Sequence, residues 1–207
     1  LWGHECLRTF SDRLVSSDDK AWFLEQIKAG VKTHFSLDYK KLRPDESTEL
    51  LYCDFFTPGY DPSIYEEVTS HSKLGEIVGE HLAEYNEQNI PMNLVLFGDA
   101  VAHICRICRV LRQPGGNSLL LGVGGSGRQS LARLATQIAD YQIFQIEITK
   151  NYRTLEWRED LQNLLRTAGM ECKDVVFLFT DTQIADEIFL ENINNILSAG
   201  EVPNLFE

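Results

Sequence analysis

Hydrophobic residues in the first part of the chain recur every three or four positions, as they do on one face of a helix. This spacing predicts a helical region over residues 1–36, in which the cluster Ser16-Ser17-Asp18-Asp19 supplies the N-cap of a second helix. Residues 37–63 are interrupted by prolines and contain one short apolar run, LLYCDFF at 50–56. They therefore predict a connector.

The helical pattern returns in two further stretches. Residues 65–88 form an acidic helical pattern, most simply a solvated helix face. Residues 92–112 form a more strongly apolar one, which ends at Pro114-Gly115-Gly116. We expect a helix in each stretch.

From residue 118 onward, short apolar runs alternate with helical patterns. Strands separated by helices favour parallel pairing with right-handed crossovers, which predicts an α/β fold. The run DVVFLFTD is apolar almost throughout, so its strand is expected to be buried on both faces. The predicted strands are 118–121, 143–149 and 175–180, and the predicted helices are 130–140, 155–168 and 186–199.

These elements suggest three regions. Residues 1–42 are a helical segment, residues 43–90 are a connector with a helix leading into the next region, and residues 91–207 are an α/β subdomain. Both ends of the sequence fall where an element is expected to continue, so we expect the chain to be a fragment of a longer protein.

Composition narrows the possible partners. The 207 residues are 43% hydrophobic, which is enough for one sizeable core, and they carry a net charge of −12. That charge disfavours binding to nucleic acid or to an anionic membrane. No apolar run approaches the roughly 20 residues that span a bilayer. Any phosphate site must therefore be built locally from backbone N–H groups and a few cations.

The five cysteines are scattered among apolar neighbours, which predicts free, buried thiols in a reducing compartment. Cys105 and Cys108 form a C-x-x-C pair, but it falls within a predicted helix and has no second pair. Buried helix cysteines are favoured here over zinc or redox chemistry. The neighbouring His103 is interpreted as a packed or surface imidazole.

The glycine-rich turn after residue 121 is the strongest candidate for a site. Its sequence, GVGGSG, fits the first part of the phosphate-binding pattern G-x-x-x-x-G-K-[ST], between an apolar run and a helix. Such a turn lets N–H groups converge on phosphate oxygens at a helix N-terminus. The predicted nucleotide-binding residues are Gly122, Val123, Gly124, Gly125, Ser126, Gly127, Arg128, Gln129 and Ser130.

The turn departs from the pattern at two positions. Arg128 replaces the lysine; it keeps the charge and can bind phosphate through two N–H groups, but it is bulkier. Gln129 replaces the Ser or Thr that would bind Mg²⁺. Ser130 is one residue later, about 100° round the helix, and could cap the helix instead.

A second part of the site is expected at the end of the strand VVFLFTD. Asp181 is a candidate for holding Mg²⁺, either directly or through water. ATPases of the AAA+ kind place a glutamate next, to polarise the attacking water, whereas this chain has Thr182. A hydroxyl is not a competent general base near neutral pH, so no catalytic residue is predicted. Glu187 is interpreted as a solvated helix residue.

At this point the sequence resembles the dynein heavy chains. The stretches at 103–135, 151–169 and 176–207 resemble the fourth AAA+ module of the motor ring, and LWGHECLRTFSDRL at 1–14 resembles the end of the third module's lid. The variants GRQS and TDTQ are similar to axonemal members. The resemblance implies a P-loop AAA+ core, a parallel sheet flanked by helices, within a minus-end-directed microtubule motor.

The resemblance also implies partners and a location. They are ATP or ADP with Mg²⁺, neighbouring AAA+ modules, the microtubule through a stalk, and dynein intermediate and light chains, in the cytoplasm, cytoskeleton and ciliary axoneme. The leading hypothesis is a regulatory nucleotide-binding module with weak or absent hydrolysis. Two alternatives remain open: an active ATPase module, and a structural spacer whose empty pocket is closed by a salt bridge from Arg128 to Asp181.

Overall fold

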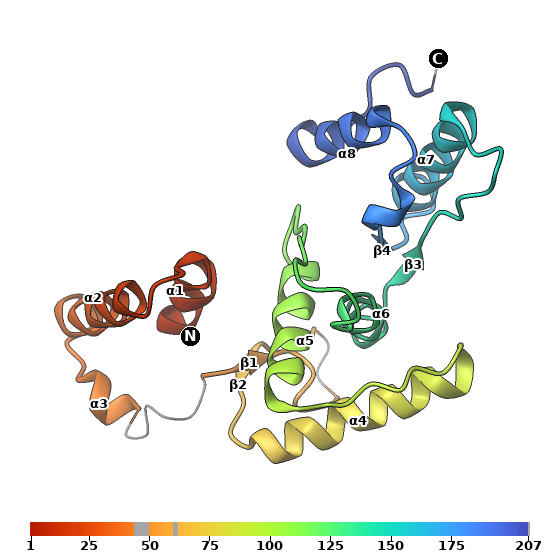
Figure 1. The fold of residues 1–207 in the computed structure, drawn as a ribbon. Helices are drawn as coiled ribbons and strands as arrows, with labels where there is room; N and C mark the ends of the chain where they lie inside the picture. The colour runs from red at the N-terminus through yellow and green to blue at the C-terminus, as the bar shows by residue number, and fades with distance from the viewer. Residues whose placement is uncertain (44–49, 60–61, 207) are drawn as a thin grey trace. The chain divides into compact units, whose positions relative to one another are not determined.

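The computed structural model describes residues 1–43, 50–59 and 62–206 (Figure 1). The chain divides into two compact units, Leu1–Ile77 and Val78–Glu207, and the division falls inside one helix. Each unit is presented by itself. The predicted boundary at 42/43 borders residues 44–49, which lie outside the described residues, so the three predicted regions stay a prediction.

The first unit opens with helices, as the hydrophobic spacing predicts. They are α1 (Trp2–Phe10), the 3₁₀ helix η1 (Ser11–Arg13), α2 (Ser17–Phe35) and α3 (Tyr39–Leu42). The side chain of Ser16 caps α2 by accepting a hydrogen bond from the Asp18 amide at 3.2 Å, which confirms the predicted N-cap. Ile27, Val31 and Tyr39 form the buried cluster of these helices.

The same unit contains a small antiparallel ladder that the sequence pattern does not predict. Strand β1 (Tyr52–Cys53) pairs with β2 (Glu66–Glu67). The helix expected from residue 65 is therefore wrong over its first residues, since α4 (His71–Gln88) begins later. A tertiary contact helps to explain the difference: His4 hydrogen-bonds both the Leu50 carbonyl and the Tyr65 hydroxyl at 2.9 Å, which ties both ends of this region to α1.

In the second unit, α5 (Gly98–Leu111) starts later than the helical pattern over 92–112 predicts. The Asn86 side chain accepts from the Met92 amide at 2.8 Å and donates to the Met92 carbonyl at 3.2 Å. The second bond occupies the Met92 carbonyl, which a helix beginning at this residue would use for its first intrahelical bond. The segment before α5 is consequently irregular.

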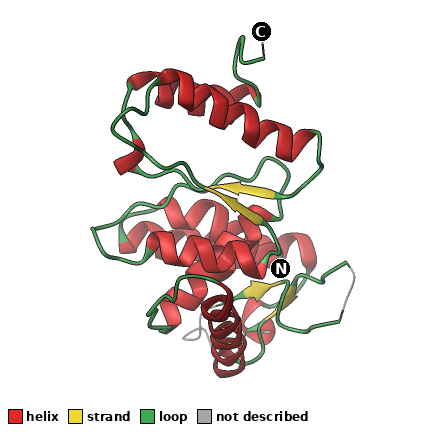
Figure 2. Cartoon of the chain, turned by 90° about the vertical axis from the view of Figure 1, so that its right-hand side faces the viewer, coloured by secondary structure: helices red, strands yellow, loops and turns green. Residues whose placement is uncertain are grey.

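A parallel pair of strands forms the centre of the second unit. Strand β3 (Gln142–Phe144) pairs in parallel with β4 (Val175–Phe177), with Ile143 opposite Val176. Helices α6 (Arg128–Ile138) and α7 (Thr154–Gly169) contact β3 and β4 respectively, and α8 (Glu187–Ala199) contacts α7. Figure 2 shows the strands with helices on both sides. The predicted α/β fold with a parallel sheet flanked by helices is confirmed.

The strands are shorter than predicted, and the first one is absent. Residues 118–121 are irregular; Leu119 and Leu121 are 83% and 81% exposed. Strand β4 is half-buried rather than buried on both faces. The physical reason is that a strand needs a hydrogen-bonded neighbour, and the described part of this sheet has two strands.

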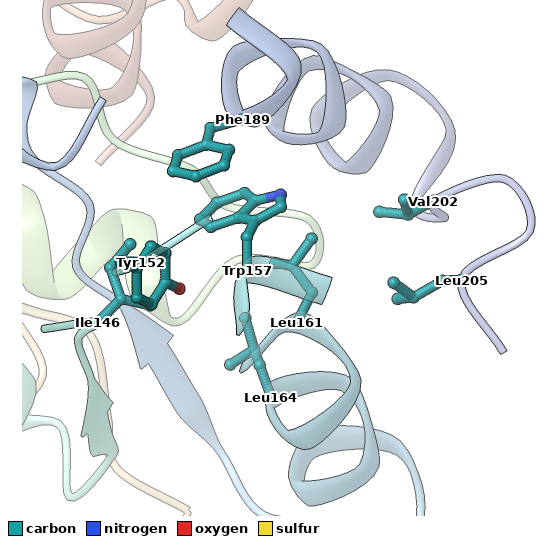
Figure 3. Close-up of a cluster of buried hydrophobic side chains, with 8 residues drawn as sticks. All are labelled: Ile146, Tyr152, Trp157, Leu161, Leu164, Phe189, Val202 and Leu205. Atoms are coloured by element: carbon teal, nitrogen blue, oxygen red, sulfur yellow. The ribbon is translucent and has the colours of Figure 1, made fainter. Parts of the chain in front are cut away.

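One hydrophobic core of this unit is an aromatic cluster between α7 and α8 (Figure 3). Trp157 is fully buried, and its ring stacks on Phe189 with centroids 4.3 Å apart. Its indole Nε1 donates to Asn192 Oδ1 at 2.9 Å. Trp157 is therefore a packing residue, as predicted. The adjacent Arg158 donates to the Asn204 carbonyl, inside the same unit.

Candidate functional site

The glycine turn is an open, exposed turn that leads directly into α6. Gly125 and Gly127 have φ of +77° and +76°, a region that side-chain-bearing residues rarely adopt. The Ser126 amide donates to the Val123 carbonyl at 3.3 Å, which closes the turn. Glycine thus supplies the positive φ that this turn requires at residues 125 and 127.

Helix α6 begins at Arg128, with Gly127 as its N-cap, rather than at Ser130. Ser130 is consequently inside the first turn, and the prediction that it could cap the helix is wrong. Gly127 has no side chain, and the first intrahelical bond runs from the Leu131 amide to the Gly127 carbonyl at 2.8 Å. Within the described residues, the amides of residues 128–130 have no hydrogen-bond partner, as is usual for a first turn.

Arg128 lies back across the turn instead of extending from the helix. Its Nη2 donates to the Val123 carbonyl at 3.4 Å, and a Cβ placed on Gly122 would lie 3.5 Å from the Arg128 Cδ. That distance is an ordinary van der Waals contact, so the Arg128 side chain packs beside Gly122. In the part of the chain that the structure describes, Arg128 makes no ion pair with Asp181.

Asp181 starts a 3₁₀ turn, η2 (Asp181–Gln183), shortly after β4. Its Oδ1 accepts from the Thr182 amide at 3.1 Å, whereas its Oδ2 has no hydrogen-bond partner among the described residues. The Thr182 hydroxyl shares a hydrogen bond with the Thr180 hydroxyl at 3.0 Å. Glu187 is exposed in the first turn of α8, as predicted for a solvated residue.

The sequence analysis missed Gln183, which is 5% exposed and fully hydrogen-bonded at its amide oxygen. It accepts from the Thr180 amide at 2.8 Å and from the Thr180 hydroxyl at 3.1 Å, and it donates to the Ile146 carbonyl at 2.5 Å. A signal was available: Thr and Gln three residues apart form the spacing of a capping box.

The structure therefore presents the predicted residues in two places. Residues 122–130 form the turn and the first turn of α6, and Asp181 with Thr182 forms the turn after β4. No hydrogen bond or ion pair between described residues joins the two places. The chemistry they offer is an anion site made of amides and one guanidinium, and a carboxylate with one free oxygen.

The cysteines lie outside these two places. Cys105 and Cys108 are buried in α5, as predicted, and the Cys108 thiol donates to the Ala135 carbonyl at 3.7 Å. Cys172 is exposed and Cys6 half-buried, so the prediction of uniformly buried thiols is wrong for these two. Of the two predicted alternatives for His103, a packed or a surface imidazole, the structure shows the second, because His103 is exposed. The described residues hold no cluster of three or more His, Cys, Asp or Glu side chains suited to a metal.

One titratable group in the core has a shifted pKa. The Tyr152 hydroxyl donates to Asp160 Oδ2 at 2.6 Å. Burial, and then this hydrogen bond and the negative charge of Asp160, raise the pKa of Tyr152. The group is a structural anchor of the aromatic cluster, since it packs edge-on against Phe189 with ring centroids 6.0 Å apart.

An open cavity of about 520 Å³ lies elsewhere, beside the residues that precede β3 and β4. Tyr141 and Asp174 line it, so it opens at the amino ends of the strands, whereas Asp181 follows a carboxyl end. It is not part of the phosphate turn. None of the helices in the described ranges combines the length and apolarity needed to cross a bilayer.

Comparison with known proteins agrees with these features. Residues 92–207 match the family model described as P-loop containing dynein motor region D4. The chain is similar to mouse dynein axonemal heavy chain 1 (49% identity over 207 residues) and human dynein axonemal heavy chain 2 (51% over 209). It is also similar to the Chlamydomonas reinhardtii dynein-1-beta heavy chain of the flagellar inner arm I1 complex (48% over 209). All of this chain is covered, but it spans only 5% of each relative.

Proposed function

Because the chain belongs to the family of the P-loop containing dynein motor region D4, we propose that it is a regulatory nucleotide-binding module of an axonemal dynein heavy chain. It holds ATP or ADP with Mg²⁺ and hydrolyses ATP weakly or not at all. The observation that carries the proposal is a helix N-terminus that follows a glycine turn and has no side-chain cap, combined with a threonine at the water-activating position.

The turn fits a polyphosphate. The unpaired amides of residues 128–130 offer several donors close together, and the partial positive charge of the helix N-terminus favours an anion. Arg128 has a long, weak bond to the Val123 carbonyl, which it can exchange for a charge-assisted bond to phosphate. The lysine of the usual pattern is thus replaced by a cation already folded over the turn.

Different residues support the proposed Mg²⁺ site and the proposed weak hydrolysis. Asp181 has one oxygen free, which suits a role beside Mg²⁺, whose charge would offset that of the phosphates. Thr182 cannot take a proton from water near neutral pH, and its hydroxyl is already hydrogen-bonded to Thr180. Binding without efficient hydrolysis makes the nucleotide a ligand that biases the ring between conformations, provided that its affinity differs between them.

The whole protein is proposed to be a minus-end-directed microtubule motor of the ciliary axoneme. The relatives are named as axonemal heavy chains and as part of a flagellar inner arm complex. Its partners are then the neighbouring AAA+ modules of the same polypeptide, the microtubule, and intermediate and light chains. Sedimentation with microtubules, released by ATP, tests this for the complete heavy chain.

Nucleotide binding at this site is tested by photolabelling the intact heavy chain with azido-ATP and mapping the labelled peptide. Labelling within residues 103–135 is expected. Arg128→Ala should weaken it about 10- to 150-fold, since a hydrogen bond to a charged group contributes about 1.5–3 kcal/mol. The matched control is Arg133→Ala in the same helix, whose guanidinium is bonded to Gln145. Absence of label at millimolar azido-ATP refutes the proposal.

Hydrolysis is tested by single-turnover phosphate release from a heavy chain whose other nucleotide sites are disabled. The proposal expects slow release in the wild type and faster release in Thr182→Glu, which restores a carboxylate next to Asp181. Rapid release in the wild type that disappears in Asp181→Ala would instead establish an active ATPase module.

A further inference from the structure

We infer that Gln183 is a positioning residue for the metal side of this site: its buried amide holds the Asp181–Thr182 turn in place and thereby sets the Mg²⁺ requirement for nucleotide binding. The inference rests on the proposed nucleotide site and adds a residue that the phosphate-binding pattern does not contain.

The first observation is that the Gln183 amide is buried and well satisfied. Three hydrogen bonds, two accepted from Thr180 and one donated to Ile146, use most of the four that a glutamine amide can make. Losing them would leave the Thr180 amide and the Ile146 carbonyl without these partners. A side chain held in this way has one conformation, which a positioning residue requires.

The second observation is where those bonds lie. Thr180 immediately precedes Asp181, and Gln183 closes the turn behind it, with the Gln183 amide donating to the Thr180 carbonyl at 2.9 Å. The backbone of Asp181 therefore lies between the two ends of one hydrogen-bonded turn. Because Asp181 is itself exposed, the turn and not its own packing fixes the direction of its free oxygen.

The third observation links this turn to the neighbouring strand. Backbone pairing between β3 and β4 continues as far as the Leu178 amide, which donates to the Phe144 carbonyl at 2.9 Å. Beyond that point, Gln183 makes the next polar link, to the carbonyl of Ile146 in the aromatic core. Gln183 thus anchors the exposed turn to a buried hydrophobic cluster.

A merely structural role would lower stability without changing the metal dependence. The experiment therefore measures, in the intact heavy chain, azido-ATP labelling of the 103–135 peptide as a function of Mg²⁺ concentration and again in excess EDTA. Gln183→Met keeps the approximate volume and removes the amide. The matched control is Gln162→Met, since Gln162 also donates to a backbone carbonyl, that of Leu205 at 2.6 Å, but from α7.

The expected result for Gln183→Met is a rise of about tenfold in the Mg²⁺ concentration at half-maximal labelling, because outer-shell partners typically change metal affinity by 10–100-fold. Labelling in EDTA should stay within about twofold of the wild type, because the amides of α6 are untouched. Gln162→Met should leave both values unchanged. If Gln183→Met loses the EDTA labelling through misfolding, Gln183→Glu, which keeps the acceptor for Thr180 but not the donor to Ile146, should show the Mg²⁺ shift.

The outcomes separate the two proposals. In one outcome, labelling of the wild type depends on Mg²⁺, and Gln183→Met and Gln183→Glu show the same Mg²⁺ dependence as the wild type. This result overturns the role of Gln183 but leaves the proposed nucleotide site intact. Wild-type labelling that ignores Mg²⁺ overturns the role of Gln183 together with the metal role of Asp181. Absence of wild-type labelling removes the nucleotide site and this inference with it.

Discussion

The hydrogen bond between Trp157 and Asn192 offers a quantitative test of how α7 and α8 hold the second unit together. The perturbation is Trp157→Phe, which keeps an aromatic ring against Phe189 but removes the indole N–H. Asn192 is 9% exposed, so its Oδ1 would be left without a partner in the core.

The magnitude follows from two effects. Leaving a buried acceptor unpaired costs about 1–3 kcal/mol. Replacing indole by phenyl at a fully buried position leaves a partial void, which adds roughly 1 kcal/mol. We therefore expect Trp157→Phe to lower the free energy of unfolding by about 2–4 kcal/mol. Asn192→Leu leaves the indole N–H unpaired instead and should cost about 1–3 kcal/mol.

The assay is urea unfolding of the 207-residue chain, followed by far-UV circular dichroism, for both single variants and the double variant. Since the double variant removes donor and acceptor together, it should be about 1–2 kcal/mol more stable than the sum of the single effects predicts. Trp22→Phe is the control, because Trp22 is 63% exposed, and should stay within about 0.5 kcal/mol of the wild type. Additive effects of the two core substitutions would refute the coupling.

Three further predictions concern pH, thiols and the glycine turn. Burial and the neighbouring Glu67 raise the pKa of Tyr52 from 10.0 to about 12. The stability that Tyr52 contributes is therefore complete below pH 10 and is lost as the pH rises toward 12. Tyr52→Phe should flatten this decline when unfolding is measured as a function of pH, and an unchanged profile would contradict the prediction. Of the five thiols, the exposed Cys172 should react fastest with an aromatic disulfide reagent. Cys172→Ser should abolish this fast phase of the reaction. Equally fast labelling of Cys105 or Cys108 would contradict the burial of their thiols. Gly127→Ala should lower the free energy of unfolding, measured in urea, by about 1–2 kcal/mol because the φ of Gly127 is +76°. Gly124→Ala should cost less, since Gly124 has open space around it and no positive φ. Equal losses would argue against the left-handed turn.

Much of the helical structure follows from local sequence. The spacing of apolar residues places α1, α2, α7 and α8 to within a few residues, and Ser16 caps α2 as predicted. A helix satisfies its own backbone hydrogen bonds, so the information needed to form it lies within the segment. The parallel pairing of β3 and β4 also follows, because the order of strands and helices along the chain restricts the topology.

The errors fall where the outcome depends on distant residues. Residues 118–121 have a strand-like composition but no strand partner in the described sheet, and β1 and β2 pair in a region where a connector and a helix are expected. The capping-box spacing of Thr180 and Gln183 is visible in the sequence, but the bond from Gln183 to the distant Ile146 carbonyl is seen only in the folded structure. Asp181 and Thr182 are found from sequence because they follow an apolar run, but which Asp181 oxygen is free is a property of the folded turn.

The sequence by itself determined the helices, the parallel α/β order and the glycine turn, since each depends on the chemistry of neighbouring residues along the chain. The tertiary structure alone decided which apolar runs became strands and that Gln183 binds the Ile146 carbonyl. Those features depend on pairing and burial between segments far apart in the chain, and the free energy of such contacts is not encoded in either segment alone.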